Sequence, residues 1–280
     1  MTLNEIIMSL EIGLIYGIVA LGIYLTFRII DFPDLTCDGS FVLGAATSSI
    51  LIKTGTNPWL SLLAAILAGS IAGVVTAVLY IKFRITDLLA GILVGFMLYS
   101  INLRIMGGIP NISLINSNTI FVYLPAVQLL IIGLATCGIV TYLLLTDFGL
   151  SLRSIGQNKR LAQNSGVNIS LMTGTGLALS NAVIALGGAL FSQHQGFADI
   201  GSGIGTVIVG LASVMIGEKI LPFQSIAFKT IGCLVGSVLY RLFISFALHG
   251  DVLGLTTSDL NLITGFMVIA IIYVSRRGAC

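Results

Sequence analysis

Charge is scarce in this sequence. Asp, Glu, Lys and Arg make up only 9% of its 280 residues, whereas a soluble domain carries about 25%. Hydrophobic residues make up 56% of the chain, and the mean hydropathy is +1.08. Such a chain cannot cover itself with a solvated surface. The composition excludes an ordinary soluble domain, and we expect the lipid bilayer rather than nucleic acid as its surroundings.

Residue types that carry chemistry are also few. The sequence has two histidines and four scattered cysteines, with no CxxC pair and no histidine at ligand spacing from a cysteine. Lone cysteines in apolar runs act mainly as small apolar side chains. No reactive Ser, Cys or His stands beside a positioned base, and no GxxxxGK[ST] phosphate-binding loop occurs. We therefore expect no catalytic residues, no metal and no cofactor on this chain, and any ATP hydrolysis must occur on another polypeptide.

The sequence does contain a series of apolar runs, each close to the roughly 20 residues that cross a bilayer. We predict one all-α, polytopic membrane domain over residues 1–280 with about nine crossings. They are expected at 5–27, 36–53, 59–81, 86–106, 121–145, 171–193, 200–217, 223–248 and 259–275. The runs 36–53 and 200–217 are short, so these helices are expected to be broken or re-entrant.

Basic residues predict the orientation. With nine alternating spans, one set of loops contains nine basic residues and the other contains two. The first set is Arg28, Lys82, Arg84, Arg153, Lys159, Arg160, Lys219, Arg276 and Arg277, and the second is Lys53 and Arg104. Because basic loops stay in the cytoplasm, we expect the N-terminus outside and the C-terminus inside a bacterial cytoplasmic membrane.

Glycine is abundant, at 33 residues. Several pairs are four positions apart, including Gly13/Gly17, Gly69/Gly73, Gly91/Gly95 and Gly232/Gly236. Small residues at this spacing allow membrane helices to approach closely. We favour packing within one bundle over a dedicated dimer motif.

Three carboxylates follow the first apolar run. The stretch from Arg28 to Ser40 contains Asp31, Asp34 and Asp38 together with Pro33 and Thr36. Proline disfavours helix for the residue before it, and Asp, Thr and Ser are good helix N-caps. Ionisable groups near apolar runs usually face a cavity or the protein interior. We predict a broken helix whose second half starts near the membrane interior, with a solvated cytoplasmic loop as the alternative.

A second polar stretch runs from Gly149 to Asn168. Leu152, Ile155, Lys159 and Ala162 fall near one side at helical spacing, and Gly166 suits a helix C-terminus. The pattern predicts a short polar helix along the membrane surface that is available to a partner. A plain basic loop is the alternative.

These stretches, followed by the glycines from Gly201 to Gly205 before the apolar run to Gly217, resemble the permeases of branched-chain amino acid and ribose ATP-binding-cassette importers. In that family a short polar motif of the form Asp-Leu-Ser-Val-Gly-Ser opens the second helix, and Asp34-Leu-Thr-Cys-Asp-Gly-Ser40 holds that place. The segment Gly149–Asn168 matches most specifically. Residues 27–45 resemble a branch associated with lipoprotein-type binding proteins, some linked to tryptophan or tyrosine uptake. Glu218 and Lys219 depart from the family's glycines.

The resemblance implies an importer made of separate parts. An extracytoplasmic binding protein would deliver the substrate to two permease copies, which we expect to be identical, and a dimer of cytoplasmic ATP-binding subunits would drive transport. Residues 150–165 would form the coupling helix. The resemblance points to Arg153, Asn158, Lys159, Arg160 and Gln163 for the ATPase contact, and to Asp31, Asp34, Thr36, Asp38 and Ser40 for the substrate path.

Rival interpretations stay open at this point. The three carboxylates also fit a secondary transporter or channel driven by an ion gradient. The expected substrate is an amino acid, with an aromatic one as the narrower prediction and a sugar or nucleoside as the alternative.

Overall fold

A computed structural model describes residues 3–115, 117–121, 124–221, 225–249, 264–266 and 269. The first helix, α1 (Leu3–Ile23), continues without a break into a π-helix, η1 (Tyr24–Ile30). The longer helices that follow are α2 (Thr36–Lys53), α3 (Pro58–Ile81), α4 (Asp87–Ile105), α5 (Pro125–Leu145), α8 (Ile169–Gln195), α9 (Thr206–Ile220) and α10 (Ile226–His249). The short elements are β1 (Asn111–Ser113), α6 (Asp147–Gln157), α7 (Lys159–Asn164), β2 (Phe197–Asp199) and the 3-10 helix η2 (Ile200–Gly203).

Seven of the described helices are long and apolar enough to cross a membrane. They correspond to seven of the nine predicted spans, which makes the chain a multi-pass membrane protein. The predicted span 36–53 is α2, which is not among the seven. Because α2 packs against α3, α4 and α8, it can be more polar than a helix surrounded by lipid. The ninth predicted span, 259–275, lies outside the described residues apart from 264–266 and 269.

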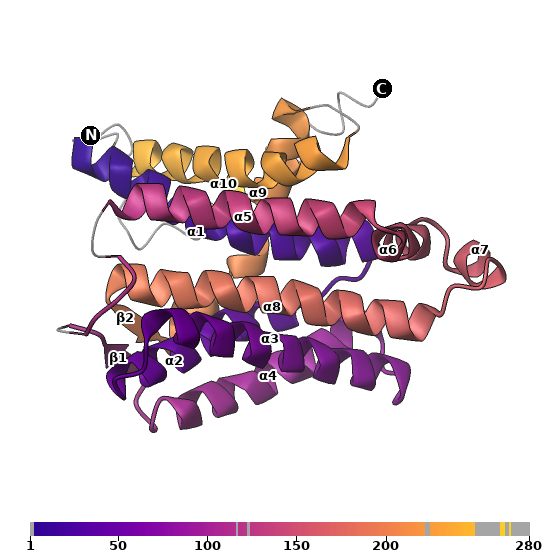
Figure 1. Cartoon of the computed structure of the whole chain (residues 1–280), viewed down its shortest axis with the longest axis horizontal. Coiled ribbons are helices and arrows are strands. Elements are labelled where there is room, and N and C mark those ends of the chain that lie inside the picture. Colours follow the sequence, from indigo (N-terminus) through magenta and orange to yellow (C-terminus); the bar gives the residue numbers. More distant parts are fainter. Residues whose placement is uncertain are drawn as a thin grey trace.

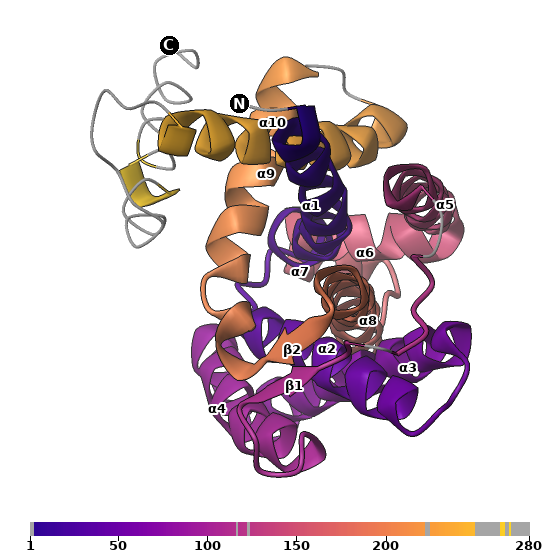
Figure 2. The ribbon, with the colours of Figure 1, turned by 90° about the vertical axis from the view of Figure 1, so that its left-hand side faces the viewer.

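Helix α8 lies at the centre of the bundle. In Figures 1 and 2 it separates a group formed by α2, α3 and α4 from a group formed by α1, α5 and α10. Helix α9 joins the two groups along one side, from the start of α2 to α10 (Figure 2). This arrangement gives α8 contacts with both groups, so α8 at the centre and α9 at the side together connect them.

The glycine pairs pack within this bundle. A Cβ atom added at Gly73 on α3 would lie 2.3 Å from the Leu177 carbonyl oxygen on α8. One added at Gly236 on α10 would lie 2.1 Å from the Ser213 carbonyl oxygen on α9. The spacing therefore serves close helix packing inside the chain, as favoured from the sequence.

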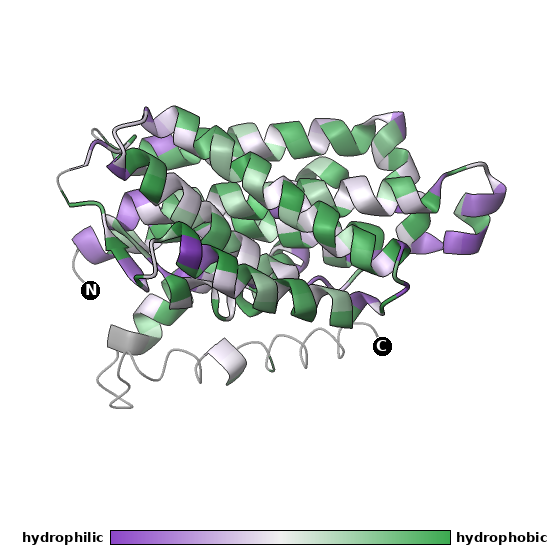
Figure 3. Ribbon diagram, turned by 90° about the horizontal axis from the view of Figure 1, so that it is seen from below, coloured by the Kyte–Doolittle hydropathy of each residue, from purple (hydrophilic) through white to green (hydrophobic). Residues whose placement is uncertain are grey.

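The two ends of the bundle differ. The antiparallel pair β1–β2 lies at the same end as the start of α1, and α6 lies at the opposite end, from which α7 projects (Figure 1). Hydrophobic residues cover the length of the helices and hydrophilic residues gather at the ends, most visibly on α7 (Figure 3). Loops at the α6–α7 end carry most of the described basic residues, whereas the β1–β2 end carries Lys53 and Arg104.

Candidate functional site

The link between η1 and α2 breaks the path of the chain. Asp31 is exposed and left-handed, with φ 56°, a conformation that Asp tolerates better than most residues. Phe32 is then fully buried, with its ring centroid 5.1 Å from that of Tyr80 on α3. The chain turns back into the bundle here, so α2 starts inside it. The broken helix predicted from Pro33 and the carboxylates is present.

Asp34 is completely buried where the chain re-enters the bundle. One carboxylate oxygen accepts a hydrogen bond from the Thr36 amide at 2.9 Å, and the other accepts one from Nδ2 of Asn181 at 2.7 Å. Asn181 is 12 positions along α8 from Ile169, which places it about 18 Å from the start of that helix at 1.5 Å per residue. Asp34 therefore fastens the start of α2 to the middle of α8.

Two more of the predicted path residues belong to this buried cluster. Ser40 donates to Oδ1 of Asn181 at 2.7 Å, and the hydroxyls of Thr36 and Thr76 on α3 are 2.7 Å apart. Both side chains are fully buried. Asp34, Thr36 and Ser40 thus face helices α3 and α8, while Asp31 lies apart at the surface.

Asp38 has a different environment. Its two carboxylate oxygens accept hydrogen bonds from the Gly205 amide at 3.2 Å, the Thr206 hydroxyl at 2.6 Å and the Val207 amide at 3.0 Å. The N-cap of α9 is Gly205, which has no side chain that could accept from these amides. Asp38 supplies the cap from the first turn of α2, where its charge also favours the N-terminus of its own helix.

A cavity of about 610 Å³ opens beside Asp38, between α2, α4 and η2. Its lining is largely apolar and includes Phe96, Tyr99 and Ile204, with Asn102 among the few polar groups. Asn102 is 1% exposed; its Nδ2 donates to the Gly39 carbonyl at 3.1 Å, and its buried Oδ1 has no partner among the described residues. Small-molecule sites usually combine this size and apolar lining with a few placed polar groups.

The cavity could not be found from sequence spacing. Phe96, Tyr99 and Asn102 lie at helical spacing on α4, a pattern that is equally typical of a lipid-facing surface. Two polar residues were the available signals: Asp38, which was predicted for the substrate path, and Asn102, which lies inside an apolar run.

The predicted surface helix over 150–165 is two helices. Asn158 adopts an extended conformation and separates α6 from α7, and its side chain accepts from the Leu161 amide at 3.1 Å. Gly166 has φ 86° and ends α7, as its position predicted. Arg160, Leu161 and Gln163 are exposed, with Leu161 at 63%. Lys159 is also exposed and lies 6.0 Å from the Tyr80 ring centroid. Arg153 instead faces a polar cavity inside the bundle end.

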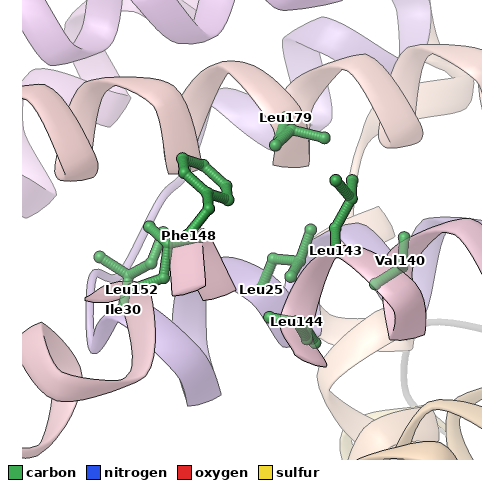
Figure 4. Close-up of a pocket in the computed structure, with 9 residues that line it drawn as sticks. Leu25, Ile30, Val140, Leu143, Leu144, Phe148, Leu152 and Leu179 are labelled. Atoms are coloured by element: carbon green, nitrogen blue, oxygen red, sulfur yellow. The ribbon is translucent and has the colours of Figure 1, made fainter. Parts of the chain in front are cut away.

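Helix α6 is anchored firmly in the bundle. Phe148 and Leu152 lie with Ile30 of η1, and Leu25, Leu143 and Leu144 lie beside them (Figure 4). The space that these apolar side chains enclose is about 10 Å³, which is at the lower limit for one water molecule. A Cβ atom added at Gly156 would lie 2.0 Å from the Ile29 carbonyl oxygen. Helix α6 therefore rests directly on η1, and movement of either requires movement of the other.

One buried polar contact has no counterpart in the sequence predictions. Nε2 of His194 at the end of α8 lies 2.8 Å from a carboxylate oxygen of Glu11 on α1, and both side chains are nearly buried. An acidic residue inside an apolar run is costly without a partner, so Glu11 was itself a signal. The pair ties α1 to α8 near the β1–β2 end.

Comparisons with known proteins cover almost all of the chain. A family described as "Branched-chain amino acid transport system / permease component" matches residues 6–272. The chain is 40% identical over 270 residues to the tyrosine transport system permease protein of Clostridioides difficile, which covers 96% of this chain and 90% of that protein. It is 24% identical over 241 residues to the nucleoside ABC transporter permease protein NupC of Lactococcus lactis, covering 76% and 72%.

A solved structure shares the fold. The structure described as PsaBC from Streptococcus pneumoniae in complex with Fab matches with a TM-score of 0.57 and 14% identity. The match covers 96% of this chain and 89% of that chain.

Proposed function

The chain belongs to the family of permease components of branched-chain amino acid transport systems, and we propose that it is the membrane-spanning subunit of an ATP-binding-cassette importer for an amino acid. Binding and hydrolysis of ATP would take place on a separate pair of cytoplasmic subunits, since no phosphate-binding loop occurs in this sequence. An external binding protein would deliver the substrate to two copies of the permease.

The projecting α6–α7 segment is the observation that carries this proposal. Helix α7 stands out from the end of the bundle (Figure 3). Its Leu161 is exposed, and so are Lys159, Arg160 and Gln163 around it. An exposed leucine surrounded by polar groups is suited to insertion into a cleft of a partner protein. Because α6 packs on η1 at Gly156, a displacement of α7 would move α6 and η1 together. That movement would reach residues 31–35, which link η1 to α2. Asn158 and Arg153 would then shape the segment rather than form its tip.

The cavity beside Asp38 is the proposed substrate path. The aromatic side chains and apolar walls of the cavity suit a ring. Movement of the buried Asn102 side chain would let its Oδ1 accept a hydrogen bond from an amino or hydroxyl group. A relative is named as a tyrosine permease, which favours an aromatic amino acid. A nucleoside also has a ring and donors, and a more distant relative is named for nucleosides. Of the five path residues predicted from sequence, Asp38 is the one that lines this cavity.

The orientation follows from charge. With the α6–α7 end inside, the basic loops lie in the cytoplasm and the β1–β2 end meets the external binding protein. Phe96 and Ile204 at the cavity mouth are 74% and 79% exposed, and we place the second permease copy against this side. The path would then lie between two identical subunits.

A pull-down from mild detergent tests the proposal. Wild type is expected to recover an ATP-binding subunit, and Arg160→Glu to reduce that recovery roughly tenfold by reversing a charge at the contact. Arg160→Lys and Lys53→Glu, the latter at the opposite end, are matched controls that should recover the subunit normally. Failure to recover any ATPase with wild type after crosslinking in membranes would overturn the proposal. Uptake that collapses with the ion gradient instead would identify a secondary transporter.

A further inference from the structure

A second cavity lies at the α6–α7 end of the bundle, between η1, α6, α9 and α10. Its volume is about 690 Å³. Three basic side chains line it, Arg28, Arg153 and Lys229, and one acidic side chain, Glu218. Three positive charges and one negative charge leave a formal net charge of +2 in a space at the end of the membrane-crossing helices.

Within the described residues, the internal ion pairing does not neutralise this charge. Arg28 pairs with Glu218, which uses the one carboxylate of the lining. Neither Arg153 nor Lys229 forms an ion pair with a described residue. The Nε atom of Arg153 is buried without a hydrogen-bond partner. A buried donor of a charged group without an acceptor is costly, so the electrostatics of this lining favour an anion.

The geometry of the lining indicates which anion fits. Arg153 is on α6 and Lys229 is on α10, so the two unpaired cations approach from different elements. A tetrahedral phosphate presents oxygens in several directions and can meet both, and the guanidinium fork of arginine matches phosphate well. Ile29, Leu221 and Ile226 form an apolar part of the same lining. Basic pockets of this kind between membrane helices bind phospholipid headgroups.

We propose that this cavity binds a phosphate-bearing anion, either the headgroup of an acidic phospholipid or a free phosphate ion, through Arg153 and Lys229. The bound anion neutralises the excess charge and joins α6 to α10. Since α6 precedes the exposed α7, occupancy would stiffen the base of the projecting segment. The site depends on the cavity and its charges alone and does not require the transport activity.

Native mass spectrometry of the full-length chain in detergent tests the site, with phosphatidylglycerol and phosphatidylcholine as probes. Phosphatidylglycerol should bind more tightly. Lys229→Gln and Arg153→Gln should each weaken it roughly fivefold, since one basic group is lost near the membrane surface. Glu218→Gln removes the one acidic side chain among the described residues of the lining and should strengthen binding by a similar factor. Lys82→Gln, an exposed basic residue outside the lining, should leave it unchanged.

Addition of inorganic phosphate distinguishes the two sources. Displacement of phosphatidylglycerol by millimolar phosphate, or phosphate adducts on the lipid-free chain, identifies a free ion; lack of competition identifies the lipid. Equal retention of both lipids overturns the proposal, as does weaker binding by Glu218→Gln. The proposal also fails if the Lys229 amine crosslinks to a carboxylate of a co-purified ATPase that excludes the lipid. None of these readouts measures uptake, so their outcome does not decide whether the chain belongs to an importer.

Discussion

Asp34 and Asp38 are four positions apart in the sequence, yet their surroundings differ. Asp34 is fully buried, and both of its oxygens accept hydrogen bonds from Thr36 and Asn181. Asp38 holds the start of α9 and also lines a cavity of about 610 Å³. The first region is closed and satisfied, whereas the second contains Asn102 with an acceptor left unmet. Asp34 therefore acts only within the packed helices, whereas Asp38 both caps α9 and borders the cavity that we propose as the substrate path.

The largest effect on stability should come from Asp34→Ala. This change leaves the Thr36 amide and Nδ2 of Asn181 buried without the acceptors that Asp34 provides, at a cost of about 2–6 kcal/mol for the two groups together. We expect a large drop in the thermal unfolding midpoint in detergent and a low yield of folded protein. Asp31→Ala, at the exposed start of the same link, is the control and should unfold like wild type. A normal unfolding midpoint for Asp34→Ala would show that the hydrogen bonds of Asp34 do not stabilise the fold.

Asp38→Ala should have a smaller effect on stability. Loss of a helix N-cap costs about 1–2 kcal/mol, and Gly205 cannot replace it. Asp38→Asn keeps one acceptor oxygen and should lose roughly half as much. Thermal unfolding ranks the two variants, and tracer uptake in proteoliposomes should fall in both. Equal losses from Asp34→Ala and Asp38→Ala would remove the distinction between the two regions.

Ser40→Ala should cost less still. It leaves Oδ1 of Asn181 without its donor, which is worth about 1 kcal/mol. The bond from Asn181 to Asp34 should survive, so the start of α2 should keep its position. A double-mutant cycle with Asn181→Ala measures the coupling. Additive losses, with no coupling energy, would contradict a shared network.

Asn102→Leu should change stability least, within about 0.5 kcal/mol, because it removes one hydrogen bond and one unmet acceptor together. Uptake should nevertheless fall roughly tenfold if Oδ1 contacts the substrate. The readout is the affinity and rate of tracer uptake beside the unfolding midpoint. Leu98→Ile, on the same helix in a buried apolar contact, is the control. A stable variant with unchanged uptake would remove Asn102 from the proposed path.

Much of the architecture could be predicted because apolar runs and their ends are local signals. The break after Arg28 was predicted from Pro33 and three carboxylates, and the end of α7 from Gly166. The partners of those carboxylates could not be predicted. Asn181 is 147 positions from Asp34, and nothing local to either residue indicates that they meet. The division of the surface segment into α6 and α7 was missed because periodicity continues through Asn158.

The capping of α9 by Asp38 has a consequence for the order of folding. The amides of Gly205 and Val207 find their acceptor on a residue 167 to 169 positions earlier in the chain. Helix α9 itself offers them no acceptor, because the first amides of a helix have no partner within it. We therefore expect the first turn of α9 to become stable only after it packs against α2. The residue that completes this helix is synthesised long before the helix itself.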